Sequence, residues 1–533
     1  MRIQRNQISF LALTAAAFLA VSAGGARAQS VSTLHTQLNS LQDQINAINA
    51  KLQQVNAQAA QQATVAQQQA VVSQQQATVA RQQLLATSGN TWYANTTAGM
   101  SPLFRTKDGS TFTIGGQVEI DTGLGTTPAM GTARNPAGFS GATQFRRIEF
   151  QAVGTYHYNW LYKVEEDLSE TNQPLGGLLD VYFGYRAPTG PFTTITLAGN
   201  QHVPFGFQTP SNATIYMEND MGNNLFQDNR ELGITGMTYN DHWNFWYGGF
   251  SNNVGAACSG ASAKTTIVQG ACFSPGSTTN KAIINGQWAV SGVAAYNVFN
   301  TPGHLLSLRD SLEYNKFNGA QGSNNNNPSI GTFPDVSVSG EKFINTGSLG
   351  IQSELVESPR IDFEDNRLNL AAVWYYATTQ SNSEINSLST LAAAHRHLTP
   401  SFSSWDLEAD YFLTDDHLPF ENSVGGGSSY TTVHVHHPVG EGGWGALELV
   451  SRIDEANLSA SRFGIYGGNE TNITVGAVWS PISPMRIDLN YIHTLPIGGA
   501  SVATNTLNPT SASTNSFKGR TSDIVALRLE VAF

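Results

Sequence analysis

The chain has 533 residues and a formal net charge of −12, and only 12% of its residues are charged, against about 25% in ordinary soluble domains. The negative charge argues against nucleic acid as a partner, because such binding depends on neutralising phosphates. Apolar residues make up 40% of the chain, which fits either a soluble all-β protein or a membrane barrel that alternates lipid-facing and water-facing side chains.

The first 28 residues have the features of a secretory signal peptide. Arg2 and Arg5 precede an apolar run over residues 8–21, and Ala26-Arg27-Ala28 fits the small-x-small rule for cleavage. The run is too short to anchor the chain permanently across about 30 Å of hydrocarbon. We therefore expect an exported chain that begins at Gln29.

Residues 29–88 are predicted to form a periplasmic coiled coil. From Leu34 to Val55 the apolar residues recur in steps of three and four, which is the seam of a heptad repeat, and after a stutter at Ala59 and Ala63 the rhythm continues mostly with alanine. Mixed Ile, Leu and Val in the seam does not select a dimer, so a three-stranded assembly is compatible with it. The alternative is an amphipathic helix that lies on its own domain.

Residues 89–110 are predicted to be a linker, because Ser88-Gly89-Asn90 ends the helical pattern and Gly, Pro and Thr follow. The only two cysteines, Cys258 and Cys272, lie further along in a Gly/Ser/Ala-rich stretch. In an oxidising compartment they are expected to form a disulfide, which would stabilise a surface loop by about 3 kcal/mol.

From residue 111 to 533 the apolar period changes to two, which indicates β-strands. In one segment Trp405, Leu407 and Ala409 alternate with Asp406 and Glu408. About sixteen such segments of about ten residues are present, the length that a tilted strand needs to cross a bilayer. The expected fold is an all-β transmembrane barrel of about 16 antiparallel strands with an aqueous lumen, and a soluble sandwich is the alternative.

The last strand has the sharpest local pattern. Val525, Leu527 and Leu529 alternate with water-facing residues, and the strand stops on Phe533. A terminal aromatic residue of this kind resembles the signal read by the outer-membrane assembly machinery. We therefore expect that machinery as a partner, together with outer-membrane lipid and lipopolysaccharide.

Aromatic residues cluster at the ends of the predicted strands, with Trp160, Trp243, Trp246 and Trp374 among them. Tyr and Trp are enriched where a barrel meets the membrane–water interface. These residues are therefore predicted to form interfacial girdles on the outer surface.

Several basic residues fall on the water-facing side of the predicted strands, where a ladder of them would attract anions. Each has an acidic residue nearby, so ion pairing that merely satisfies charges inside the barrel is the alternative. The outcome depends on the potential at the narrowest point of a pore. The pore-lining candidates are Arg147, Lys163, Arg186, Arg452, Arg486 and Arg528.

About thirty residues separate the strand predicted to end at Asn200 from the one predicted to start at Glu231, far more than a usual hairpin connection. We expect this loop to fold into the lumen and constrict the pore. A plain extracellular loop or a latch between subunits is the alternative. The constriction candidates are His202, Phe205, Glu218, Asp220 and Arg230.

Two blocks of the sequence resemble the phosphate-selective porin O/P family, whose members are trimers of sixteen-stranded barrels. The resemblance implies a homotrimeric outer-membrane porin of a diderm bacterium, with anions and phosphate as solutes. Where family members commonly carry Lys before the Pro-Phe-Gly turn, this chain has His202. The blocks include Arg146-Arg147, Trp160-Leu161-Tyr162-Lys163, Asp180-Val181-Tyr182-Phe183, Val203-Pro204-Phe205-Gly206, Gly443-Trp444-Gly445 and Asn490-Tyr491.

The first functional hypothesis is a passive porin for small hydrophilic solutes, with some preference for anions. The second is a structural role, in which the coiled coil tethers the outer membrane to the cell wall. An enzyme is the least favoured class, because no phosphate loop, GxSxG motif or paired catalytic constellation is present in the sequence. No cofactor or metal is expected.

Overall fold

The computed structural model divides into two units, residues 1–88 and 89–533. The predicted signal peptide, the heptads beyond residue 54, Cys258 and Cys272 lie outside the described residues. The structure describes residues 36, 38–54, 93–96, 101–126, 141–169, 177–207, 215–227, 230–251, 288–317, 330–332, 335–336, 342–347, 349, 351–381, 399–499, 503–504, 512–513 and 517–533.

In the first unit residues 38–54 are helical. The seam residues Leu41, Ile45 and Ile48 are all exposed, the last with 64% of its surface accessible. An uncovered apolar stripe is what a helix presents before it meets a partner. Within the described part of the chain, no helix has the length and apolar character needed to cross a membrane.

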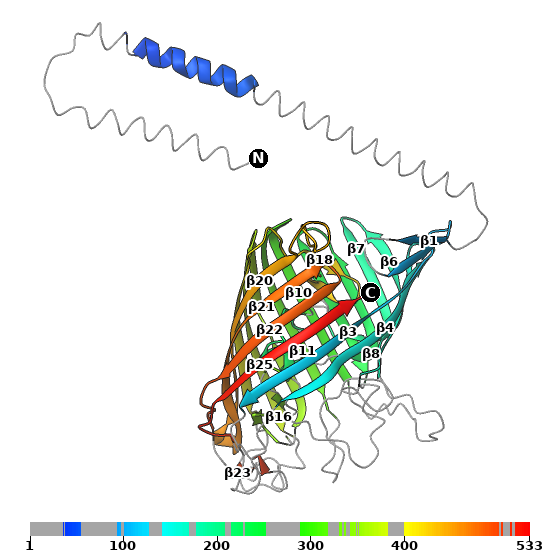
Figure 1. Cartoon of the computed structure of the whole chain (residues 1–533), viewed down its shortest axis with the longest axis vertical. Coiled ribbons are helices and arrows are strands. Elements are labelled where there is room, and N and C mark those ends of the chain that lie inside the picture. Colours follow the sequence, from blue (N-terminus) through cyan, green and yellow to red (C-terminus); the bar gives the residue numbers. More distant parts are fainter. Residues whose placement is uncertain are drawn as a thin grey trace, which may run out of the picture. The chain divides into compact units, whose positions relative to one another are not determined.

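The second unit is a closed antiparallel β-barrel (Figure 1). Each strand pairs with the next in chain order, and β25 pairs with β3 to complete the ring. The wall consists of β3 (Thr111–Thr126), β4 (Ala142–Tyr156), β5 (Trp160–Asp167), β6 (Gly177–Thr189), β7 (Phe192–His202), β8 (Arg230–Tyr239), β9 (Trp243–Ser251), β10 (Trp288–Thr301), β11 (His304–Lys316), β14 (Ile351–Glu357), β15 (Arg360–Asp365), β16 (Leu368–Ser381), β17 (Ser401–Phe412), β20 (Ala446–Ala460), β21 (Ile465–Ile482), β22 (Met485–Thr494) and β25 (Ser522–Ala532).

The barrel has sixteen strands, as predicted. The sheet as a whole has nineteen, but two are short N-terminal additions, and β14 and β15 are halves of one strand because both pair with β11 and with β16. The interruption falls at Ser358 and Pro359. Ser358 still exchanges both backbone hydrogen bonds with Ser311, whereas Pro359 has no N–H to donate to the ladder.

The predicted alternation of inner and outer side chains is confirmed along the strands. On β17, Leu407 and Tyr411 are about half exposed, whereas Asp406 and Asp410 on the other face are 1% and 6% exposed. Apolar residues therefore face the lipid and charged residues face the lumen.

The predicted linker contains two short strands, β1 (Tyr93–Thr96) and β2 (Pro102–Arg105). β2 pairs with the first residues of β3, which extend beyond the end of β25. Phe533 directly follows β25, and its backbone exchanges hydrogen bonds of 2.7 and 2.9 Å with Gly116. Along one edge, the first residues of β3 thus pair with β2 and the following residues pair with Phe533 and β25. This pairing leaves fewer backbone groups of β3 without a hydrogen-bond partner.

One end of the barrel carries mostly short turns, at residues 157–159, 190–191, 240–242, 302–303, 366–367 and 483–484. The connection between β17 and β20 is the exception at this end, because it spans residues 413–445. It contains the hairpin of β18 (Phe420–Ser423) and β19 (Gly427–Tyr430). Figure 1 shows β18 toward the end of the barrel to which the C-terminal strand points.

Candidate functional site

The connection between β7 and β8, residues 203–229, is here called the inner loop. Most of its described residues are buried, with Phe205 and Met221 fully inaccessible and Met217 1% exposed, whereas Asn219 and Asn224 are exposed. Residues Met221–Phe226 form the short helix α3, whose N-cap Asp220 accepts a hydrogen bond of 2.8 Å from the backbone N–H of Asn223. Such a cap satisfies one of the amide groups that a helix start leaves free.

Polar contacts hold the inner loop against the far wall of the lumen. The backbone N–H of Met217 donates to Asn490 of β22, the Arg528 guanidinium of β25 donates to the Met217 carbonyl, and the Met221 N–H donates to Asp454 of β20. The loop leaves from β7, which lies across a sixteen-strand ring from β20. It therefore crosses the barrel, as the sequence predicted.

A β-bulge places one further anchor that simple alternation misses. The pairing of β3 with β4 shifts between Glu119 and Ile120, which makes Arg146 the extra residue beside Arg147. A bulge re-aims the side chains next to it. Arg146 thereby reaches the inner loop and forms two hydrogen bonds with Glu218, of 2.9 and 3.1 Å.

Glu218 lies in the loop rather than in a membrane-spanning strand. Burial of its carboxyl would by itself raise its pKa, but the charge and hydrogen bond of Arg146, with smaller contributions from Arg528 and Arg147, outweigh burial and lower the pKa to about 2. The pair therefore stays ionised throughout the physiological range.

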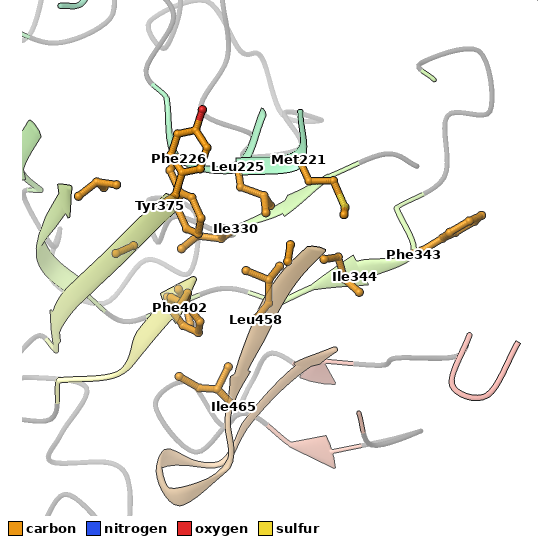
Figure 2. Close-up of a cluster of buried hydrophobic side chains, with 14 of the residues drawn as sticks. Met221, Leu225, Phe226, Ile330, Phe343, Ile344, Tyr375, Phe402, Leu458 and Ile465 are labelled. Atoms are coloured by element: carbon orange, nitrogen blue, oxygen red, sulfur yellow. The ribbon is translucent and has the colours of Figure 1, made fainter. Parts of the chain in front are cut away.

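An apolar cluster fixes the other end of the loop (Figure 2). Leu225 and Phe226 of α3 pack with Tyr375 of β16, and the cluster continues into Phe402 of β17 and Leu458 of β20. The ring of Phe226 lies 6.3 Å from that of Tyr375. Figure 2 also shows Ile330, Phe343 and Ile344, from the connection between β11 and β14, on the same cluster.

The hairpin β18–β19, residues 420–430, is called the lumen hairpin, because its contacts are with the inner face of the wall. Asn422 accepts a hydrogen bond of 2.7 Å from Asn244 of β9, and the Ser428 carbonyl accepts one from Arg309 of β11. Phe420 and Tyr430 also pack on Phe207 of the inner loop, at 6.4 and 5.6 Å between ring centres. Two segments that enter the barrel from different connections thus meet inside it.

The lumen hairpin rests on an apolar patch of the inner wall. Tyr182, Leu197 and Trp246 are all buried there, and Val424 of the hairpin turn packs against them. Gly427, with φ of +69°, lies so close to Trp246 that a Cβ would come within 2.9 Å of its ring. The assignment of Trp246 to the outer girdle is therefore wrong: it is 2% exposed, on the inner face of β9, and covered by the hairpin. Trp160, Trp243 and Trp374 are exposed.

The basic pore-lining candidates lie on the inner face, but five of the six are engaged by carboxylates. Arg186 continues the inner face of β6, and the described part of the chain shows no ion pair for it. The alternative of ion pairing inside the barrel therefore describes the geometry better than a free ladder does. The pairs are Arg147–Glu119 at 2.6 Å, Lys163–Asp180 at 2.9 Å, Arg452–Asp335 at 3.2 Å, Arg486–Glu530 at 2.6 Å and Arg528–Asp121 at 2.8 Å.

The constriction candidates are not all in the loop. His202 is the last residue of β7, and Arg230 is the first residue of β8, where its guanidinium pairs with Asp180 at 2.7 Å. Phe205, Glu218 and Asp220 belong to the loop and are in place against the wall. Sequence reasoning missed Arg146 as an anchor and the whole lumen hairpin.

The family model for phosphate-selective porin O and P matches residues 112–521, which is most of the barrel and more than half of the chain. The chain belongs to this family. It is an outer-membrane porin.

Individual relatives of this porin are distant. An uncharacterised protein of Caulobacter vibrioides is 24% identical over 394 residues, which cover 73% of this chain and 70% of that protein. Two solved porin structures are also similar. The anion-selective porin from Comamonas acidovorans is 13% identical, with a TM-score of 0.43, and the match covers 80% of this chain and 100% of that chain. OmpF of Salmonella typhi in complex with daunomycin is 12% identical, with a TM-score of 0.44, and the match covers 81% of this chain and 100% of that chain.

A cavity of about 60 Å³ lies in this porin between the inner loop, the lumen hairpin and the wall. Four carboxylates and two guanidinium groups line it, together with Phe207, Tyr216 and Tyr430. The charged lining residues are Glu218, Asp220, Glu408, Asp410, Arg360 and Arg452.

Carboxylates and guanidinium groups are not equally accessible around this cavity. The side chains of Glu408 and Glu218 are 15% and 12% exposed, whereas those of Arg360 and Arg452 are 5% and 1% exposed. Both guanidinium groups also lie over aromatic rings, Arg360 over Phe207 at 4.2 Å and Arg452 over Tyr216 at 4.5 Å. Two of the four carboxylates are thus more accessible than either guanidinium group, whereas Asp220 and Asp410 are each 6% exposed.

Proposed function

We propose that this porin forms a trimer through which small hydrophilic solutes diffuse passively. The observation that supports it is the pair of segments inside a closed wall: the inner loop and the lumen hairpin narrow a lumen whose strands carry charged residues inward. A barrel without such segments would be wide enough for unselective flow.

The test is conductance of the purified mature protein in planar bilayers. Stepwise channel openings, together with a migrating species of trimer mass in detergent, support the proposal. Correctly folded protein that produces no channels would reject it.

The family description names phosphate, so we expect this member of the family to conduct anions. In this chain, His202 stands where family members commonly carry Lys, and five of the six predicted basic residues are bound to carboxylates. Competition of phosphate with chloride current would support a phosphate preference, since a bound ion slows the flow of another.

A structural role of the N-terminal region is a second proposal. The exposed seam at Leu41, Ile45 and Ile48 needs partners, and three copies in a trimer would supply them. Projected into the periplasm, such a coil would reach toward the cell wall. We also propose that Phe533 is recognised by the outer-membrane assembly machinery and that Cys258 and Cys272 form a disulfide.

A further inference from the structure

One guanidinium group inside the barrel is buried without a carboxylate in contact. Arg309 lies on the inner face of β11 and is 6% exposed, and within the described part of the chain it forms no ion pair. It donates to two backbone carbonyls, that of Ser428 in the lumen hairpin and, at 3.4 Å, that of Gly206 in the inner loop. Its Nε atom is buried and has no hydrogen-bond partner among the described residues. Because arginine stays protonated in proteins, Arg309 keeps a positive charge that no acid in contact with it neutralises.

The surroundings of Arg309 make this arrangement costly. Arg360 lies directly opposite it in the pairing of β11 with β15, and like charges in that position repel each other. Both guanidinium groups contact the ring of Phe207, Arg309 at 4.7 Å and Arg360 at 4.2 Å from its centre. Arg360 is compensated by Asp362 at 2.9 Å, whereas Arg309 has only the ring and the two carbonyls. A buried charge without an ion pair lowers stability, and such departures from good local design are expected where function requires them.

Arg309 also connects the two segments that narrow the lumen. Asn244 of β9 donates to the side-chain oxygen of Asn422 at 2.7 Å, and the Ser428 hydroxyl donates to the same oxygen at 2.6 Å. The backbone carbonyl of Ser428 accepts from Arg309. The lumen hairpin is therefore held between two strands of the wall, β9 and β11. The contact on β11 also holds the start of the inner loop, at Gly206.

We propose that Arg309 has two roles in permeation. Its planar set of donors fixes the inner loop and the lumen hairpin relative to each other and thereby sets the aperture, and its charge favours anions over cations in the lumen. Low-dielectric walls focus the field of a fixed charge into the water that they enclose, so the second role does not require the solute to touch Arg309. This inference rests on the proposed channel function and names for it a residue that positions the pore and determines its specificity.

The charge role is tested with Arg309→Gln in the full mature protein, by reversal potentials in planar bilayers under a KCl gradient. Glutamine carries no charge, so we expect the permeability ratio of Cl⁻ to K⁺ to fall about twofold or more. Arg462→Gln removes the same charge from the exposed turn between β20 and β21 and should leave the ratio unchanged. A wild-type ratio in Arg309→Gln would overturn the charge role.

The positioning role is tested with Arg309→Lys. Lysine keeps the charge but lacks the planar fork, so it cannot hold both carbonyls in the same geometry. We expect the wild-type permeability ratio together with additional conductance levels, about 1.2-fold or more above the wild-type level, because a released hairpin widens the aperture. A single level equal to that of the wild type would overturn the positioning role. A residue with a merely structural role would alter the conductance in both variants and would leave the permeability ratio unchanged in both.

Folding of each variant is checked by the heat-dependent mobility that intact barrels show in detergent gels. If Arg309→Gln does not fold, Arg309→Met takes its place in the charge test, since it fills a similar apolar volume beside Phe207 without a charge. Absence of any channel in the wild-type protein would instead reject the proposed function.

Discussion

Individual side chains decide how firmly the inner loop is held. The Arg146–Glu218 pair joins the wall to the loop through two hydrogen bonds, and both side chains are less than 15% exposed. Loss of one partner of a buried pair leaves the other charge uncompensated, at a cost on the order of 3 kcal/mol. The Arg146–Glu218 pair therefore makes a large contribution to holding the inner loop against β4.

Glu218→Gln should therefore loosen the loop. We expect noisier single-channel current and a lower temperature of loop release, with the barrel itself intact, because the wall keeps its backbone hydrogen bonds. Single-channel recording and thermal unfolding measure the two effects, and Glu441→Gln in the exposed turn before β20 is the control. Quiet current in Glu218→Gln would show that the pair does not restrain the loop.

The same pair predicts a response to acid. The pKa of Glu218 falls from an ordinary value of 4.5 to about 2 in the folded protein. Because the folded pKa is the lower one, the stabilisation is complete above about pH 4.5 and is lost as the pH falls toward 2. Current noise in the wild type should rise only in that window and should be absent at neutral pH. A rise between pH 7 and 5 would place the titrating group elsewhere.

Some residues could be assigned from the sequence and others could not. The faces of Asp406 and Leu407 follow from the period of two, which a closed wall enforces at each strand. Arg146 does not follow from it, since a bulge adds a residue and shifts the pattern locally. The sequence did contain one indication of the bulge: strict alternation would place the charged Arg146 side chain toward the lipid, where a charge is energetically costly.

At the scale of elements, the lumen hairpin is the least expected feature. Connections at the short-turn end have two or three residues, except the one over residues 413–445. Its position could not be deduced from propensity, because it depends on contacts with strands far away in the sequence. One pattern did indicate a covered patch: Leu197 and Trp246 stand at water-facing positions, where an open lumen would favour polar residues.

Removal of the hairpin should widen the pore. With residues 420–430 replaced by a short Gly/Ser link, we expect single-channel conductance to rise about twofold or more, because conductance grows with the narrowest cross-section. A Phe420→Leu variant, which keeps an apolar contact with Phe207, serves as the matched control and should conduct like the wild type. Unchanged conductance in the deletion would show that the hairpin lies off the permeation path.

At the scale of the whole molecule, the two units predict separable functions. Deletion of residues 31–87 should leave the conductance and the reversal potential of each channel unchanged, because the barrel wall and its inner segments are all retained. Envelope integrity, measured as resistance of cells to detergent, should fall if the coiled coil reaches the cell wall. Loss of conductance in the deletion would contradict this separation.

The hydrogen bonds between Phe533 and Gly116 have a consequence for biogenesis. β25 closes the ring between β22 and β3, and until it pairs with them both strands present open rows of N–H and C=O groups. Exposed backbone of that kind cannot be tolerated in hydrocarbon. A stable barrel in the membrane therefore requires that β3 and β25, which lie about 400 residues apart in the sequence, come together before the wall is exposed to lipid.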